Sequence, residues 1–418
     1  MSFKRSLAIL SLSLVTLLVA SAAVWAQEPV EIVMWTWFDD SKEAFDIIVE
    51  QWNSQRDDIK VRHQVFPQTE YLRLLEASIA AGTAPDIFAP HVHVRGYGVN
   101  GIIVDLYEWL DEEFISRFYP STIEQFTWYG KLYALPWTAQ TFGFFYHPEI
   151  FERYGLEIPE TWDDLIEVGK VLRANGIYPV AFPNRDKWLG ADFFLPLITQ
   201  VTDDPTLVLK IDRRDSVDSE YTWDLPAVVE AFEVLKKLVD GDVFAPGING
   251  LAYEQGLALF YTGRAAMFYA GSWVPQTIAS EAPQHVRETY DVFPTPALAP
   301  GKRHWTANES GANLAVYAHG NVPEAIEFLK FLYSSDIYRD AMIRSKGMPA
   351  MPEFVDDLDD PIVRKMTSWL VDGAPHILYG AGSWDAIANA VQGVLGGMID
   401  PQTAAEQVER EVRAAMSR

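Results

Sequence analysis

The sequence predicts an α/β protein with two domains. In its N-terminal part, three predicted strands alternate with two amphipathic helices, an order that is typical of a parallel sheet. The chain has 418 residues, more than a single hydrophobic core usually serves, and two domains are therefore expected. Hydrophobic residues make up 49% of the sequence and aromatic residues 13%, which indicates a globular chain and argues against disorder.

The first strand and helix are predicted from an apolar run and a cap. Glu31–Trp37 is rich in apolar residues and predicts a buried strand. Asp40 and Glu43 form an Asp variant of the capping box, so a helix should begin there. The predicted core face of this helix carries Phe45, Ile48, Val49 and Trp52.

The next elements continue the alternation. Lys60–Phe66 predicts a strand, and Thr69 is the predicted cap of a second helix that ends before Gly82. The inward face of this helix should carry Leu72, Leu75 and Ile79. Pro85–Phe88 then opens a third strand.

The same pattern returns further along the chain. Thr161 and Asp164 form a capping box, and Tyr178–Phe182 predicts a strand that enters a loop. Two more helices are predicted after Asn321 and at Asp400-Pro401. The predicted core faces are Trp162, Leu165, Gly169 and Leu172 in the first helix, Ile326, Leu329 and Leu332 in the second, and Val408, Val412 and Met416 in the last.

The N-terminus predicts an export signal. Lys4 and Arg5 precede Ser6–Gln27, a stretch without charge that is rich in Leu, Val and Ala. Small residues near its end predict cleavage after Ala26, with Ala23 as the alternative. A retained membrane anchor is the other interpretation, because about 20 uncharged residues can span a bilayer. The chain contains no Cys, which excludes a lipoprotein and disulfides.

The chain is strongly acidic. Loss of the signal would change the formal net charge from −25 to −27. Such acidity argues against nucleic acid or anionic lipid as a partner. One polar, weakly periodic segment, Asp203–Tyr221, is predicted to be a surface excursion.

The sequence lacks the motifs of common enzyme classes. It has no Cys nucleophile, no His-Glu-x-x-His, no Walker loop and no Gly-x-Ser-x-Gly. Gly96–Gly101 matches a dinucleotide fingerprint, but no apolar strand directly precedes it, so we expect a glycine-rich loop or short helix and no cofactor. The 58 acidic residues leave a glycosidase carboxylate pair open, because sequence does not give their separation.

His91 and His93 could serve as metal ligands, since alternate residues on a strand face the same way. No third ligand is visible nearby in the sequence. The other interpretations are a surface loop or hydrogen bonding to a ligand, because the segment follows the end of a strand, where open α/β sheets place their sites.

Many of the 14 Trp residues lie in loops rich in Gly, Asp, Asn or Ser. A pyranose has an apolar C–H face and a belt of hydroxyls, which flat rings and polar side chains respectively can bind. Trp52 and Trp162 lie on predicted helix faces and are assigned to the core. Trp273 follows Gly271-Ser272 after the predicted strand Ala265–Ala270 and should project into a cleft.

Three sequence motifs follow one another along the chain. They are Tyr71–Phe88, then Gly130–Pro136 with Phe144–Gly155 and Pro159–Leu165, then Gly263–Trp273. Behind an export signal, they resemble the extracellular solute-binding proteins of bacterial ABC importers, in the sugar-carrying group that includes maltose-binding proteins. The resemblance covers essentially the whole mature chain. It implies a two-lobed periplasmic-binding-protein fold of type II with three inter-lobe crossings.

The resemblance also implies domain boundaries. A signal peptide should occupy residues 1–26, the first lobe 27–141 and 310–378, and the second lobe 142–309 and 379–418. The three crossings are expected near Thr138–Tyr146, Trp305–Ala312 and His376–Ser383.

The expected ligand-binding residues come from the crossings and the aromatic loops. Gln140 lies at the first crossing, Glu309 and Ser310 at the second, and Trp384 near the third. The loops at predicted strand ends add Trp37, Asp39, His91, His93, Trp188 and Trp273.

These observations predict a monomeric, periplasmic binding subunit of an ABC importer. It should capture a mono- or oligosaccharide and deliver it to the membrane permease subunits, with no catalysis and no cofactor. A secreted glycoside hydrolase stays open as an alternative, as does a binding protein for a polyamine, a phosphodiester or a metal ion.

Overall fold

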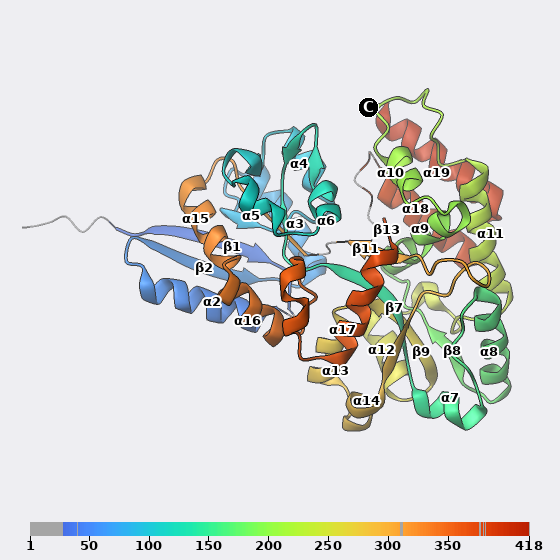
Figure 1. Cartoon of the computed structure of the whole chain (residues 1–418). Coiled ribbons are helices and arrows are strands. Elements are labelled where there is room, and N and C mark those ends of the chain that lie inside the picture. The colour runs from blue at the N-terminus through green and yellow to red at the C-terminus, as the bar shows by residue number, and fades with distance from the viewer. Residues whose placement is uncertain are drawn as a thin grey trace, which may run out of the picture.

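The computed structural model describes residues 28–39, 41–309, 312–375, 378, 380 and 382–417. Two α/β lobes are each built on a sheet of their own (Figure 1). The predicted signal segment and Asp40, the expected helix cap, lie outside the described residues. Among the helices that the structure does describe, none is long and apolar enough to cross a membrane.

The first lobe contains a five-stranded sheet of order β2-β1-β3-β12-β6. Strand β1 (Val30–Thr36) pairs in parallel with β2 (Ile59–Val65) and β3 (Ile87–Phe88). Strand β12 (Asn313–Val316) runs antiparallel to both β3 and β6 (Leu135–Pro136). The carboxyl ends of β1 and β3 therefore meet at one edge of the sheet, which is where α/β folds place their sites.

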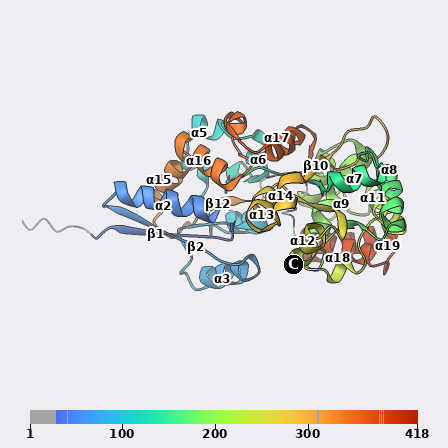
Figure 2. The ribbon, with the colours of Figure 1, turned by 90° about the horizontal axis from the view of Figure 1, so that it is seen from below.

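Helices cover both faces of this sheet. Figure 2 shows α3 (Gln68–Ala80) on the face opposite α2 (Lys42–Gln55), α15 (Val322–Leu332) and α16 (Ser335–Ser345). The shorter elements of the lobe are α4 (Val94–Val99), α5 (Glu112–Ser116), α6 (Pro120–Gln125) and the hairpin β4 (Thr127–Trp128) and β5 (Lys131–Leu132).

For the helices of the first lobe, one predicted start is wrong, while a predicted end and a predicted core residue are confirmed. Helix α3 begins at Gln68 after Pro67, so Thr69 lies within its first turn and is not its cap. The predicted end is confirmed, because Gly82 follows the helix with φ +70°, a conformation that favours glycine. Trp52, assigned to the core, is buried under α15 and packs edge-on against Phe328.

The second lobe contains a six-stranded sheet. Its main path runs β13-β11-β7-β9-β8, and β10 also pairs with β7. The strands are β7 (Gln140–Tyr146), β8 (Tyr178–Ala181), β9 (Ala265–Gly271), β10 (Asp291–Pro294), β11 (Thr306–Glu309) and β13 (Gly373–Ala374). The predicted strands at 178–182 and 265–270 are thereby confirmed.

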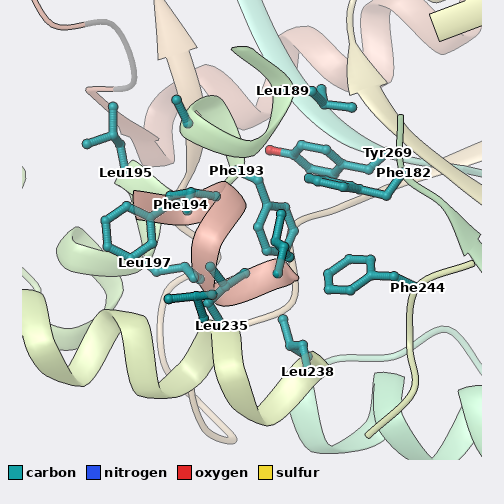
Figure 3. Close-up of a cluster of buried hydrophobic side chains, with 14 of the residues drawn as sticks. Phe182, Leu189, Phe193, Phe194, Leu195, Leu197, Leu235, Leu238, Phe244 and Tyr269 are labelled. Atoms are coloured by element: carbon teal, nitrogen blue, oxygen red, sulfur yellow. The ribbon is translucent and has the colours of Figure 1, made fainter. Parts of the chain in front are cut away.

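The helices of the second lobe enclose its core. They are α7 (Pro148–Tyr154), α8 (Trp162–Ala174), α9 (Trp188–Thr202), α10 (Thr206–Asp212), α11 (Pro226–Asp240), α12 (Tyr253–Tyr261), α13 (Val274–Glu281), α14 (Gln284–Thr289), α17 (Pro361–Thr367), α18 (Ser383–Leu395) and α19 (Pro401–Met416). Helix α9 is buried along most of its length, and Figure 3 shows Phe193 and Phe194 of this helix among Leu235, Phe244 and Tyr269.

One prediction for this lobe is wrong. The segment Asp203–Tyr221 contains helix α10, whose side chains Val208 and Ile211 are fully buried. Arg214 is also buried and pairs with Glu409 of α19 at 2.9 Å. The polar residues that suggested a surface excursion therefore include a buried ion pair, which a charge pattern alone does not distinguish from a solvated one.

In the part of the chain that the structure describes, the sheets and cores indicate three places where the chain passes from one lobe to the other. The first two lie between β6 and β7 and between β11 and β12. The third differs from the expected His376–Ser383. Phe354 packs in the core of the first lobe, whereas Leu358 packs with Phe145 of β7 and Phe268 of β9 in the second lobe, and β13 already pairs with β11. Residues 361–374 thus belong with the second sheet. The sequence did not predict this, because a strand of two residues leaves no recognisable pattern. The other lobe boundaries stay predictions.

A capping box closes the N-terminus of α8. Asp164 N–H donates to Thr161 Oγ1 at 3.2 Å, and Thr161 N–H donates to Asp164 Oδ2 at 2.9 Å. Thr161→Ala removes the cap and should lower the free energy of unfolding by about 1 kcal/mol, as measured by urea unfolding. Thr262→Ala, at the exposed end of α12, is the control and should change it by less than about 0.5 kcal/mol. Equal losses in both variants would show that the cap contributes nothing specific.

Candidate functional site

A cavity of about 680 Å³ opens between the two lobes. Its first-lobe wall runs from the N-terminal half of α3 through the turn after β3 and along α4. Its second-lobe wall is the start of α18 and the residues just before it. The lining residues are Leu72, His91, Val92, His93, Arg95, Gly96, Val99 and Asn100 from the first lobe, and Leu378, Gly380, Gly382, Trp384 and Asp385 from the second.

The first-lobe wall is positioned by Tyr71 of α3. Its hydroxyl lies 3.1 Å from the carbonyl oxygen of Trp35 and 3.0 Å from that of Ala89, and it accepts the Ala89 N–H at 2.9 Å. The side chain is fully buried. One hydroxyl therefore ties the carboxyl ends of β1 and β3 together, and the loops that follow these strands start from fixed points.

Trp37 and His91 belong to those two loops. The Trp37 ring packs edge-on against His91, with ring centroids 5.1 Å apart, and against Tyr71 at 5.0 Å. His91 has φ +51°, a left-handed conformation that is uncommon outside glycine. Burial lowers the pKa of His91 to about 4, so the ring is neutral at pH 7. Its Nδ1 atom is buried and has no partner among the described residues.

His93 faces charged groups of both lobes. Its ring stacks on Tyr97 with centroids 5.5 Å apart, and Nε2 lies 3.9 Å from Glu76 Oε1. Burial lowers the pKa of His93, while the carboxylates of Glu76 and of Asp385 across the cavity oppose that shift. The buried Tyr97 hydroxyl has no partner within the described part of the chain.

The two histidines do not form the metal pair that a strand would have given. His91–His93 is a 3₁₀ turn and not a strand, so the premise of two alternate side chains on one face does not hold. Among the described residues there is no group of three or more His, Cys, Asp or Glu side chains that could hold a metal ion.

The second-lobe wall is anchored beneath α18. The Gly380 N–H donates to both carboxylate oxygens of Asp212 at 3.0 Å, which joins this segment to α10. Gly382 follows with φ +71°, and Trp384 and Asp385 then stand in the first turn of α18. Trp384 is half-buried and packs against the second core, so its ring is held while part of it stays accessible.

Trp188 and Trp273 lie together, apart from the residues that line the cavity. Their ring centroids are 5.9 Å apart. Trp273 Nε1 donates to the Tyr253 hydroxyl at 2.8 Å, and the ring packs edge-on against Phe142 at 5.2 Å. Both Trp side chains are half-buried. Their contact with a ligand stays a prediction.

Gln140 and Glu309 lie at the lobe junction, and Asp39 lies in a first-lobe loop. Gln140 pairs in register with Glu309 at the ends of β7 and β11. Asp39 is exposed, and burial raises the pKa of its carboxyl while Lys42 opposes the shift. The Glu309 side chain and the whole of Ser310 lie outside the described residues.

Several lining residues were missed by the sequence analysis. Arg95 and Val99 lie on α4, Asn100 directly follows that helix, and Asp385 follows Trp384 on α18. Gly96–Gly101 was expected to form a loop or short helix, and α4 confirms the helix. The proximity of this glycine-rich segment to His91 and His93 was the available signal for a cavity wall.

Comparison with known proteins assigns the family. The sequence pattern of the bacterial extracellular solute-binding proteins matches residues 38–338. A binding protein of Brucella abortus is 24% identical over 91% of this chain and 90% of its own length. The maltotriose-binding protein of Pyrococcus abyssi is 23% identical over 80% of this chain and 70% of its own. The chain belongs to the bacterial extracellular solute-binding protein family.

Solved structures share the fold. The GacH receptor of Streptomyces glaucescens superposes with a TM-score of 0.79 at 21% identity, over 94% of this chain and 99% of its own length. The predicted two-lobed α/β fold of the solute-binding proteins is thereby confirmed. Members of this family act outside the cytoplasm, in agreement with the expected export.

The neutral state of His91 predicts a pH dependence. Its pKa falls from 6.5 in the unfolded chain to about 4 in the folded protein, so the unfolded chain binds more protons between these values. The stability that neutral His91 contributes is present above pH 6.5 and is lost as the pH falls toward 4. Between pH 7 and pH 5, His91→Gln should lose about 1–2 kcal/mol less stability than the wild type in urea unfolding. The exposed His319→Gln serves as control, and the same pH profile in all three proteins would contradict the assignment.

Proposed function

We propose that this protein captures a carbohydrate between its two lobes and delivers it to the membrane permease of an ABC importer. The observation that carries the proposal is the cavity between the lobes, with a half-buried indole on one wall and the neutral imidazole of His91 on the other. The Trp384 ring suits the apolar face of a sugar, and Asn100 and Asp385 suit its hydroxyls.

The size of the cavity and the relatives support a sugar. A volume of about 680 Å³ lies within the usual range of small-molecule sites. One relative is a maltotriose-binding protein, and the GacH receptor has been solved in complex with acarbose. The length and linkage of the sugar for this chain follow from neither comparison.

Closure of the lobes would complete the site. Residues of both lobes line the cavity, so a ligand that contacts both walls favours the closed arrangement. The paired strands β7 and β11, which lead from one lobe to the other, are suited to act as the hinge. Export with cleavage after Ala26, absence of lipidation and a monomeric state belong to the same proposal, and N-terminal sequencing of the exported protein would test the cleavage site.

Binding without turnover is part of this proposal. Of the described lining residues, Asp385 alone carries a carboxylate, whereas a glycosidase requires two. A thermal-shift screen of sugars, polyamines and metal ions should give a rise in melting temperature with sugars, because a ligand that binds the folded state stabilises it. Chromatography of the bound sugar should recover it unchanged. Stabilisation by polyamines alone, or sugar products that depend on the protein, would contradict the proposal.

Trp384 should contribute more to sugar affinity than to the stability of the fold. We expect Trp384→Ala to weaken sugar binding at least tenfold in calorimetry, about 1.4 kcal/mol. The loss of stability should stay below the roughly 3–5 kcal/mol of a fully buried Trp, because the ring is half-buried. Trp109→Ala removes an indole that is 37% exposed and lies outside the cavity. Equal affinities of the two variants would remove Trp384 from the site.

A further inference from the structure

A second set of contacts joins the lobes beside the cavity. Arg213, at the end of α10 in the second lobe, extends to the first lobe. Its Nη2 donates to the carbonyl oxygen of Glu124 at 3.2 Å, and its guanidinium lies over the Trp128 ring at 4.6 Å from the centroid. A guanidinium at this distance is attracted by the ring and is less strongly hydrated than an ammonium group.

The same indole is approached by a cation of its own lobe. The Arg95 guanidinium lies over the Trp128 ring at 5.0 Å. Arg95 Nη2 also donates to the Tyr129 hydroxyl at 3.2 Å, and that hydroxyl donates to Asp215 Oδ1 at 3.3 Å. Asp215 belongs to the second lobe and lies 3.8 Å from Arg95 Nη2. The contacts therefore form one connected network across the lobe boundary.

The backbone at Tyr129 is strained to make this network. Tyr129 and Gly130 form the turn of the β4–β5 hairpin with φ values of +55° and +74°. Glycine adopts this conformation readily, but a bulky residue there is an outlier and costs free energy. The Tyr129 side chain is 63% exposed, so burial in its own lobe does not explain its presence. Its two hydrogen-bonded neighbours, Arg95 and Asp215, supply an explanation.

We propose that Arg95, Glu124, Trp128 and Tyr129 of the first lobe and Arg213 and Asp215 of the second form a clasp that stabilises the closed arrangement of the lobes. Arg95 lines the ligand cavity as well, so the clasp and the ligand share one side chain. The inference rests on the proposed closure around a solute. It assigns a role to the segment 203–221 that the proposed function leaves without one.

Arg213 would influence affinity without touching the ligand. The apparent dissociation constant of a ligand that binds the closed state equals the intrinsic constant divided by the fraction of molecules that are closed. Arg213 does not line the cavity. Its removal should therefore lower affinity through the closed fraction and raise the dissociation rate of the ligand.

The experiment measures the distance between the lobes directly. The chain has no Cys, so Glu50→Cys and Glu233→Cys, both at exposed positions of α2 and α11, place one spin label on each lobe. Arg213→Ala should broaden the distance distribution of the unliganded protein and shift it to longer distances. It should also weaken sugar binding roughly three- to thirtyfold, the range of one cation–π contact at tenfold per about 1.4 kcal/mol.

Two further variants make the result specific. Arg264→Ala removes an exposed arginine that packs on Tyr178 within the second lobe, and it should leave distance and affinity unchanged. Arg213→Lys keeps the charge but loses the planar group, and it should give an intermediate distance distribution. It also provides a measurement if the alanine variant does not fold.

The outcomes separate the clasp from the proposed function. Unchanged distances in Arg213→Ala and Arg213→Lys would overturn the clasp, even if affinity fell. A protein that binds no sugar in the screen would overturn the proposed function, while the unliganded distance distributions would still decide whether the clasp exists.

Discussion

The pairing of β7 with β11 is the constraint on which the relative positions of the two lobes depend. Asn308 and Glu309 pair with Thr141 and Gln140 at the point where both strands lead toward the first lobe. The hydroxyls of Thr141 and Thr306 lie 3.1 Å apart and are fully buried. This ladder belongs to the second sheet, and short connections join it to β6 and β12 of the first. The distance between the two cavity walls therefore depends on the short connections from β6 to β7 and from β11 to β12.

Sequence reasoning succeeded mostly where the signal is local, although the cap predicted at Thr69 was wrong. The capping box at Thr161 and the cap at Asp400 are both formed, because a cap depends on residues within one helical turn. The burial of Trp162 followed from its place on a helical stripe. The position of the third crossing did not follow, because β13 is two residues long and is defined by its partner β11. Helix α10 was missed for a similar reason, since Asp212 at its end and Arg214 just after it have partners distant in sequence.

In the candidate site, too, some residues could be expected from the sequence, while others depend on contacts between distant parts of the chain. His91, His93 and Trp384 were all expected from strand ends or crossings, and they line one cavity. Trp188 and Trp273 came from equally suggestive loops, yet they pack against each other and Tyr253. A sequence indicates that an aromatic residue stands in a loop, but whether the ring meets a solute or a neighbour is decided by how the elements assemble. Arg95 could not be singled out, because the cavity that it lines and its contact with Asp215 both involve the second lobe.

The two glycines of α4 differ in what they permit. At Gly98 a Cβ atom would come within 2.4 Å of the Tyr133 ring, so a side chain there would displace α4 from the lobe. At Gly96, which lines the cavity, a Cβ atom would meet nothing within 4 Å. Of these two glycines, only Gly96 can therefore gain a side chain without displacing α4, and each atom added there would reduce the room for solute. Relatives with a larger residue at the equivalent of Gly96 would be suited to narrower cargo.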